Sequence, residues 1–481
     1  MFKTITSLIK RDKDYPQRQY DIDMLTRVLD GKLYDHLEYD FNTERKDGIG
    51  EYIPIRDRRP SVRYALCRVV VDDSISLLFS EGHFPEVDCN DEKTKEALQS
   101  IIKETKLNEV MIQAATIGSV GSVAILMRVL EGRIFFDAYN TMFLTPTWKA
   151  NAPDTLEKVV EKYKVKGSVL IDMGYSITEK NKDYWFQRDW DSAREIWYLP
   201  FAVGDDTTGP IEDAKKTVSH DLGFVPMLWI KNLPNGREID GKATFPTESI
   251  DTQIEIDYQL SQAGRGLKYS SDPTLLLKEP AIGNDGQIVK GGGNAIVVGE
   301  NGDAKMLEID GTASAAVIEY VRCLRELALE SAHGNRANAD KISAAQSGRA
   351  MELMNQSLIW LADKLRISYG EGALLSILKM IVAASAKFKL VVDSVEMAEM
   401  NKKEPISLRW PPWYAPTITD MQYKASTLNV LVDSSIISIE TATKDIAAQY
   451  DIEDVQKERA LADAERTARE ATAQKQVKIT E

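Results

Sequence analysis

Cysteine and histidine are both scarce in this chain. Its 481 residues include three cysteines, Cys67, Cys89 and Cys323, and four histidines. An odd number of widely separated cysteines argues against a disulfide framework and for a reducing compartment. No histidine has a partner at the spacing of a zinc site or a catalytic triad, and the pair His220 and Asp221 has no accompanying nucleophile. We therefore expect no metal, no cofactor and no catalytic site.

Long apolar runs and an excess of positive charge are absent as well. No window approaches the roughly 18 apolar residues of a membrane span, and the apolar run in residues 1–10 is too short for a signal peptide. Asp and Glu number 74 against 60 Lys and Arg, which gives a net charge of −14. Such a chain is not a general clamp on nucleic-acid phosphates, so contact with DNA should be local or weak. We expect a cytosolic protein that has no membrane partner.

A complete nucleotide-binding loop is also missing. The nearest candidate is the segment 236–243, in which Gly236, Gly241 and Lys242 have the spacing of a Walker loop. Ala243 follows the lysine, where such a loop needs a Ser or Thr hydroxyl to bind Mg²⁺. A surface turn is the favoured interpretation. A nucleotide-dependent enzyme with an atypical phosphate-binding loop remains the alternative function.

Apolar residues make up 43% of the chain, which is enough for buried cores, and the length suggests two to four folding units. Residues 1–115 have mainly helical periodicity, with a wide apolar face at 62–79. After Gly118 the apolar period changes, and segments 122–129 and 133–138 predict a β-hairpin. Further strands are predicted at 142–145, 156–165, 168–175, 183–187 and 195–201.

Helical periodicity returns in two segments, 247–264 and 317–331. Between them, short apolar runs at 273–278 and 294–298 are bounded by glycine-rich turns. These runs predict a small β insert between two helices. If the two helices pack side by side, the flanks of the insert lie close together.

A polar linker, 333–341, leads into a much longer helix at 343–387. At about 1.5 Å per residue this helix would run on the order of 65 Å, too long for the interior of one compact domain. We therefore expect an assembly larger than a single core to use it. Gly370 and Gly372 weaken the helix and predict a kink or break at that point.

The rest of the chain returns to short elements. Segments 390–393 and 406–410 predict a short β return, and the prolines between Trp410 and Trp413 favour aromatic packing at a sheet corner. Helices are predicted at 419–431 and 438–447, followed by a charged segment at 453–476. That segment is polar nearly all round, so we expect an exposed or fraying helix, or disorder.

The chain is thus predicted to be α+β, and its order of elements carries more information than any single motif. Segments 63–73 and 76–82 form an early helix, 114–122 joins helices to the β region, and 434–442 is a serine-rich helix entry. In this order and in these stretches the chain resembles the portal proteins of tailed bacteriophages. Those proteins form the ring at one vertex of the phage head through which DNA is packaged and ejected.

The resemblance implies a portal-type fold with a helical N-terminal region, an antiparallel β wing, paired stem helices, a small β clip, a long wing helix and a helical crown. The implied parts are a wing at 1–246, a first stem helix at 247–264, a clip at 265–312, a second stem helix at 313–331, a tunnel loop at 332–347, the long helix and wing return at 348–416, and a crown at 417–481.

The resemblance also implies function and partners. The chain would be a structural protein of the virion, not an enzyme, and would form a homo-oligomeric ring, usually of twelve copies, at one capsid vertex. It would be assembled in the host cytoplasm. Its partners would be further copies of itself, double-stranded DNA in the channel, the terminase large subunit, head-completion or adaptor proteins of the head–tail connector, and the major capsid and scaffolding proteins.

Three groups of polar residues are candidate sites under this resemblance, and each has a simpler explanation. The tunnel-loop residues expected to face DNA are His333, Asn335, Arg336, Asn338, Lys341 and Gln346. The stem-channel residues are Arg265, Lys268, Arg322 and Arg325. The clip residues expected to dock partners are Lys278, Glu279, Asn284, Asp285, Gln287 and Lys290. Ordinary solvated loops, or ion pairs such as Arg322 with Glu326, would explain the same residues.

Overall fold

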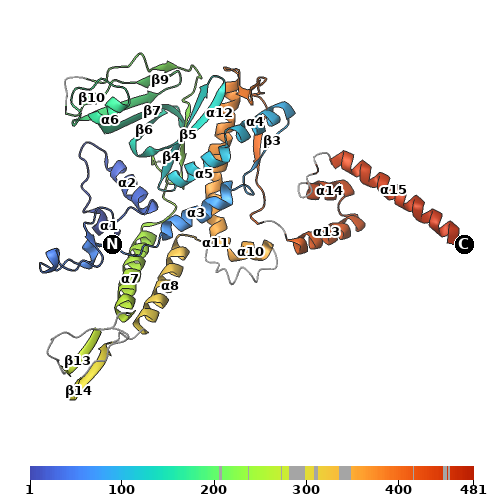
Figure 1. Cartoon of the computed structure of the whole chain (residues 1–481). Helices are drawn as coiled ribbons and strands as arrows, with labels where there is room; N and C mark the ends of the chain where they lie inside the picture. The colour runs from blue at the N-terminus through green and yellow to red at the C-terminus, as the bar shows by residue number, and fades with distance from the viewer. Residues whose placement is uncertain are drawn as a thin grey trace. The chain divides into compact units, whose positions relative to one another are not determined.

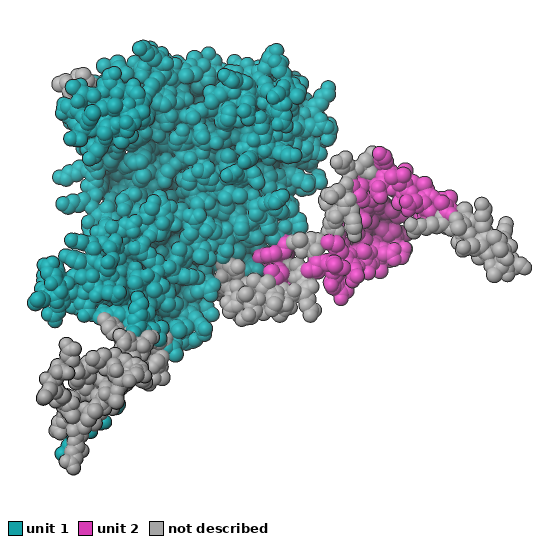
Figure 2. All heavy atoms as spheres, in the orientation of Figure 1, with its two compact units in different colours: residues 1–336, 355–413 teal, residues 337–354, 414–481 magenta. Residues whose placement is uncertain are grey.

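The computed structural model describes residues 1–204, 209–236, 238–271, 274–280, 298–307, 312–334, 348–414, 417–447, 452 and 455–480. The chain divides into two compact units, unit 1 with residues 1–336 and 355–413, and unit 2 with residues 337–354 and 414–481 (Figure 2). The described strand pairs are antiparallel apart from a short parallel pair, β1 (Tyr39–Asp40) with β2 (Arg58–Arg59). A mixed α+β chain, predicted from the sequence, is confirmed.

The N-terminal part of unit 1 is helical, as the sequence predicts. Its elements are α1 (Phe2–Thr6), α2 (Gln17–Leu29), α3 (Leu66–Phe79), α4 (Glu92–Glu104) and α5 (Leu107–Gly118), with the short 3₁₀ turns η1 (Lys46–Gly48) and η2 (Ile55–Asp57). The helix α3 begins later than its apolar pattern predicts. The backbone N–H groups of Val62 and Tyr64 instead donate to Ser261 and Asp257 of the later helix α7 (Thr247–Ser271).

Two antiparallel sheets follow α5 (Figure 1). The first has the order β12–β4–β5, with β12 at Met227–Lys231, β4 at Ser122–Leu130 and β5 at Arg133–Asn140. The predicted hairpin is therefore confirmed. Its two turn residues, Glu131 and Gly132, have positive φ angles of 51° and 81°, which a tight two-residue hairpin turn requires.

The second sheet has the order β11–β9–β8–β7–β6, with β10 also paired to β8. Its strands are β6 (Leu144–Lys149), β7 (Ala152–Lys166), β8 (Asp183–Trp190), β9 (Arg194–Trp197), β10 (Phe201–Ala202) and β11 (Val218–Ser219), and η3 (Thr141–Phe143) precedes them. The strand predicted at 168–175 is wrong, because residues Gly167–Asp172 form the helix α6. Only Leu170 of its apolar run is fully buried, and so short a run does not distinguish a strand from a helical turn.

The two helices on either side of the small β insert pack against each other (Figure 1). They are α7 and α8 (Thr312–Ser331), and the strands between them are β13 (Thr274–Pro280) and β14 (Val298–Leu307), paired antiparallel. The insert predicted between two helices is confirmed in this form. However, α7 continues past residue 264, so Arg265 and Lys268 lie in the helix and not in the insert. The second strand lies later than the predicted segment 294–298.

The long helix predicted at 343–387 is interrupted near its start. The helix α10 (Gly348–Met354) ends at Asn355, whose φ and ψ of −105° and 19° are not helical, and α10 belongs to unit 2. A continuous helix then runs through α11 (Gln356–Leu365), the π-helical η4 (Arg366–Leu374) and α12 (Leu375–Ser385). The helix therefore does not break at Gly370 as predicted, but continues through this residue in a π-helical form.

The helix Gln356–Ser385 lies in the main core of unit 1, which corrects the expectation that no single core could use it. Leu358, Tyr369, Ile377 and Ile381 are all buried there, together with residues of α3, α5 and β4. The helix is also long and apolar enough to cross a membrane by length and composition alone, and half of its most apolar window is buried in the protein. The expectation that no segment has such a composition is therefore wrong, and the contacts of this helix are those of a core helix.

The short strands after this helix pair differently from the prediction. Strand β17 (Ile406–Arg409) pairs with β3 (Glu86–Cys89), a strand that the sequence pattern did not indicate. Strand β15 (Val391–Val392) pairs with β16 (Val395–Glu396). Segments 390–393 and 406–410 therefore do not pair with each other to form one β return, because each pairs with a different strand.

Unit 2 contains the C-terminal helices α13 (Ile418–Asp433), α14 (Ile439–Ala447) and α15 (Val455–Thr480). The helix α13 starts with a capping box, in which Thr417 and Asp420 bond reciprocally to each other's backbone N–H groups. Of the polar segment predicted at 453–476, residues 455–476 lie in the helix α15, and most of its described side chains are exposed.

Candidate functional sites: a helix pair and an intersheet pocket

The pair α7 and α8 is antiparallel, and a contact at one end sets its register. Ser249 Oγ lies 3.0 Å from Ser331 Oγ and donates to the carbonyl oxygen of Ala328 at 3.4 Å. Both helices advance by about 1.5 Å per residue from this contact. Residues 254–262 of α7 are therefore roughly level with residues 316–325 of α8.

Polar side chains of α7 fix the helix to the N-terminal part of unit 1. The carboxylate of Asp257 accepts hydrogen bonds from the backbone N–H of Tyr64 at 2.6 Å and from the hydroxyl of Tyr34 at 2.8 Å. Gln253 accepts from the backbone N–H of Cys67 at 2.9 Å. Burial raises the pKa of Asp257 to about 7, and the two hydrogen bonds only partly oppose this effect. The N-terminal end of α3 is thus capped by side chains of α7 instead of by its own residues.

The helix α8 has two neighbouring apolar stripes with the same spacing. Val317, Val321, Leu324 and Ala328 are half-buried or buried, as expected for the stripe against α7. One position earlier along the helix, Ala316, Tyr320, Cys323 and Leu327 repeat the same i, i+4, i+7, i+11 spacing. All four of these residues are exposed, Tyr320 by 46% and Leu327 by 58%. We call this second set the exposed stripe, and its spacing is that of a helix–helix seam.

Two of the four stem-channel candidates are engaged within the chain. Arg265 forms an ion pair with Glu44, and Arg325 donates from Nε to the hydroxyl of Tyr64 at 3.0 Å. Lys268 and Arg322 are exposed. Arg322 lies 3.6 Å from Glu319, so it forms an ion pair with a residue one turn earlier in the helix and not with Glu326 as expected. Of the four basic residues, Arg265 and Arg325 are therefore held by contacts within the chain, and Lys268 and Arg322 are exposed.

Most of the candidate tunnel-loop and clip residues lie outside the described residues. Within the described part, His333 has a positive φ of 54° and follows the end of α8, and Lys278 and Glu279 lie in β13. The side chain of Lys278 is exposed. The remaining candidates outside the described residues are Asn335, Arg336, Asn338, Lys341, Gln346, Asn284, Asp285, Gln287 and Lys290.

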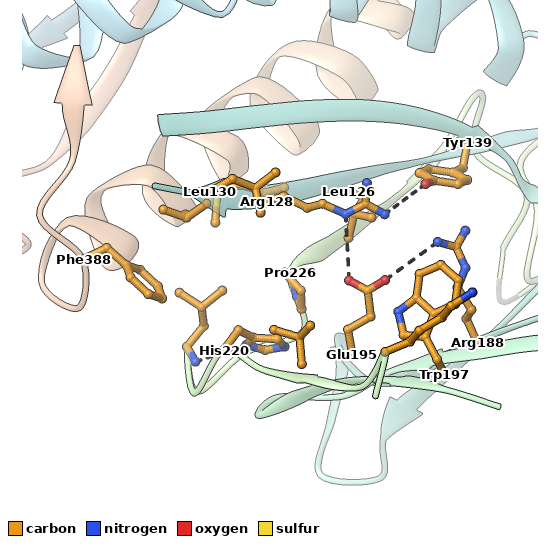
Figure 3. Close-up of a pocket in the computed structure, with 15 residues that line it drawn as sticks. Leu126, Arg128, Leu130, Tyr139, Arg188, Glu195, Trp197, His220, Pro226 and Phe388 are labelled. Carbon is orange, nitrogen blue, oxygen red and sulfur yellow. Dashed lines mark hydrogen bonds and ion pairs between the residues drawn. The ribbon is translucent and has the colours of Figure 1, made fainter. Parts of the chain in front are cut away.

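A pocket of about 510 Å³ lies between the two sheets, and no sequence motif predicted it (Figure 3). Glu195 of β9 points between Arg128 of β4 and Arg188 of β8, at 3.8 Å and 3.7 Å. Arg188 makes its closer contact with Glu161, at 2.6 Å, and stacks near the Trp197 ring. The charged side chains thus form a bridge from one sheet to the other.

The opposite end of this pocket is apolar and surrounds His220. Leu130, Pro226 and Phe388 line it with His220 (Figure 3). The Nδ1 atom of His220 accepts from the backbone N–H of Leu222 at 3.3 Å, and its buried Nε2 has no partner among the described residues. Burial lowers the pKa of His220. Alternating strands bring these residues together, so no spacing along the chain could have indicated the pocket.

The segment 236–243 has the geometry of a turn. Lys242 forms an isolated antiparallel β-bridge with Leu233. The carboxylate of Asp240 accepts hydrogen bonds from Nε and Nη2 of Arg18, at 2.6 Å and 2.8 Å. The next helix, α7, starts only at Thr247, so the turn does not lead directly into a helix N-terminus as a Walker loop does. Among the described residues, which exclude Arg237 of this turn, no group of three His, Cys, Asp or Glu side chains could hold a metal ion.

Comparison with known proteins adds no family assignment. No model of a protein family matches the chain, and no curated protein matches it significantly.

Proposed function

We propose that the chain is a portal protein, many copies of which form a closed ring at one vertex of a bacteriophage capsid. The observation that carries this proposal is the exposed stripe of α8. A helix of a self-contained monomer has one apolar face, which is buried against the core. Among the residues that the structure describes, nothing covers the second stripe on α8, and a neighbouring copy would supply a cover.

The helix α13 in unit 2 supports the same proposal. None of its residues, Ile418–Asp433, is buried, and Ile418, Tyr423 and Val430 are exposed by 76%, 71% and 62%. Side chains of this kind leave water when another chain packs against them. A ring of rotated copies has head-to-tail interfaces that cover such surfaces on every copy.

The channel of this ring would carry double-stranded DNA. A conduit for DNA of any sequence works best with weak phosphate contacts, because each contact must break as the duplex advances. The net charge of −14 suits this requirement. The few basic residues at 332–347, Arg336 and Lys341, are our candidates for light DNA contact, and the β13–β14 insert is the candidate docking site for the terminase and the connector proteins.

The experiment that tests the proposal is the mass and shape of the purified chain. Native mass spectrometry and class-averaged electron microscopy should show a closed ring of many copies with a central hole. A chain that stays monomeric at micromolar concentration would overturn the portal function. A melting temperature that also rises with ATP and Mg²⁺ would favour a nucleotide-dependent enzyme.

A further inference from the structure

A groove of about 470 Å³ lies between α1, η2 and α7 and extends along α7 from residue 254 to residue 262. Its apolar wall is formed by Ile5, Ile55, Ile254 and Tyr258. Ile254 is fully buried at its floor, whereas Ile55 is 41% exposed at its edge. We call this feature the α1–α7 groove.

The groove and the exposed stripe lie on different sides of the helix pair. Both α1 and α8 contact α7, and Figure 1 shows α1 and α8 on opposite sides of it. The side of α7 that forms the groove is therefore not the side that receives α8. One copy of the chain thus carries an apolar ridge on one side and an apolar groove on the other.

The ridge and the groove also lie at the same height. The groove uses residues 254–262 of α7, and the register set by the contacts of Ser249 with Ala328 and Ser331 makes these level with about 316–325 of α8. The exposed stripe occupies residues 316–327. Two complementary surfaces at one height, on opposite sides, can be joined by rotation without a shift along the helices. Repeated rotation without a shift closes into a ring when the rotation angle divides a full turn, whereas a shift would produce a helical filament.

The charges at the edges are compatible with this contact. Arg56 lines the groove, and its side chain is 71% exposed. On α8, Glu319 and Glu326 flank the exposed stripe, and both are exposed. An arginine facing two glutamates at the edge of an apolar seam favours one register of the two surfaces over others.

We propose that the exposed stripe of α8 packs into the α1–α7 groove of the next copy. Tyr320 and Leu327 enter the groove against Ile254 and Tyr258, and Arg56 faces Glu319 or Glu326. The occupant is a second copy of this chain. This inference rests on the proposed ring and specifies which two surfaces form its contact.

A disulfide tests the register, because the stripe already contains an exposed cysteine. Cys67 and Cys89 are buried, so Cys323 is the accessible thiol. Residue 255 is roughly level with Cys323, so Glu255→Cys should place a second thiol opposite it across the contact. Oxidation of this variant should give a ladder of covalent multimers on a non-reducing gel, since one bond joins each adjacent pair of copies.

Three controls make the result specific. The double variant Glu255→Cys with Cys323→Ser should give no ladder. Gln262→Cys is displaced by about 10 Å along α7 and should crosslink to Cys323 far less. Oxidation of the unaltered chain should give no covalent dimer, because a Cys323–Cys323 bond would mean that two stripes pack face to face, which overturns the proposal.

A second measurement does not depend on crosslinking. Leu327→Asp should abolish the ring species in native mass spectrometry and leave the melting temperature of the dissociated chain unchanged, since Leu327 is already exposed there. Leu199→Asp, at a 43% exposed leucine outside both surfaces, should leave the ring intact.

The outcomes of these experiments distinguish a failure of this inference from a failure of the proposed portal function. Rings without a ladder, or rings that persist in Leu327→Asp, would overturn the pairing of stripe and groove while the portal function stands. The absence of any ring from the unaltered chain would overturn both.

Discussion

The hydroxyl of Tyr34 donates to the carboxylate of Asp257 at 2.8 Å, and both side chains are shielded from water. The pair joins the segment after α2 to α7. Hydrogen bonds from Tyr64 and Tyr34 oppose the cost of burying Asp257, and the positive charge of Arg63 adds a smaller effect in the same direction. One of the side chains that anchor α7 to the rest of unit 1 is therefore a carboxyl group whose pKa lies near 7.

Asp257→Asn should remove a pH dependence of stability. Burial raises the folded-state pKa of Asp257 to about 7, whereas the unfolded value is near 3.8. As pH rises from about 4 to 7, the unfolded chain loses this proton before the folded chain does. The free energy of unfolding should therefore fall by roughly 3 kcal/mol over that range and then level off. Asparagine does not titrate, and the difference between urea-unfolding curves of the two proteins from pH 4 to pH 8 measures the effect.

An exposed carboxylate is the matched control for that experiment. Asp172→Asn, at the exposed end of α6, should leave the pH dependence of the unfolding free energy unchanged. Parallel pH curves for the unaltered chain and Asp257→Asn would show that Asp257 does not titrate in this range.

Sequence patterns predicted those parts of the fold whose neighbours lie close in the chain. The β4–β5 hairpin follows from alternation and a two-residue turn, and the paired helices around a β insert follow from periodicity. The pairing of β17 with β3 joins segments more than 300 residues apart in the sequence, and no local pattern contains it. The start of α3 was misplaced for a similar reason, because Asp257 and Ser261 come from a distant helix.

The candidate sites show the same limit. The exposed stripe of α8 could have been found from its spacing, since Tyr320, Cys323 and Leu327 each lie one position before a residue of the buried stripe. A pattern alone does not say which of two stripes is buried. The intersheet pocket joins Arg128, Arg188 and Glu195 through strand pairing, and only the folded chain brings their charges together.

Gly370→Ala should destabilise unit 1 because of its contact with Trp410. A Cβ atom at Gly370 would lie 2.3 Å from Trp410 Cζ2, so the indole ring would have to move. The Cζ atom of Arg366 lies 4.5 Å from the centre of the Trp410 ring and 3.2 Å from the centre of the Trp413 ring, so a moved Trp410 ring would disturb this contact. We expect a loss of about 1–3 kcal/mol in the free energy of unfolding, measured by urea titration.

The neighbouring glycine is the control for this overpacking. Gly372 is exposed, and an added Cβ would meet only the carbonyl oxygen of Ile367, at 3.2 Å. Gly372→Ala should be neutral or stabilising by up to about 1 kcal/mol, because alanine favours a helix. Equal losses for the two variants would mean that helix flexibility, and not the Trp410 contact, requires glycine here.

The two carboxylates beside Arg188 should differ in their effect on stability. Glu161 contacts Arg188 at 2.6 Å, and Glu195 lies at 3.7 Å and is shared with Arg128. Glu161→Gln leaves a largely buried guanidinium without its close partner and should cost about 3 kcal/mol. Glu195→Gln should cost less, on the order of 1 kcal/mol. Thermal unfolding of the two variants measures the difference, and a larger loss for Glu195→Gln would assign the main bridge between the sheets to Glu195.

Replacing Arg336 and Lys341 together with alanine should alter DNA handling and leave the ring intact. Under the portal proposal these residues contact phosphates in the channel lightly, so their removal should change packaged DNA length or retention and not assembly. Native mass spectrometry of the variant checks the ring, and nuclease-protected DNA per particle checks packaging. Lys389→Ala is the control, because its side chain is 83% exposed and it belongs to none of the candidate sites. If packaging and retention match the unaltered protein across a range of salt concentrations, Arg336 and Lys341 do not face DNA, and the constriction must be formed by other residues of the ring.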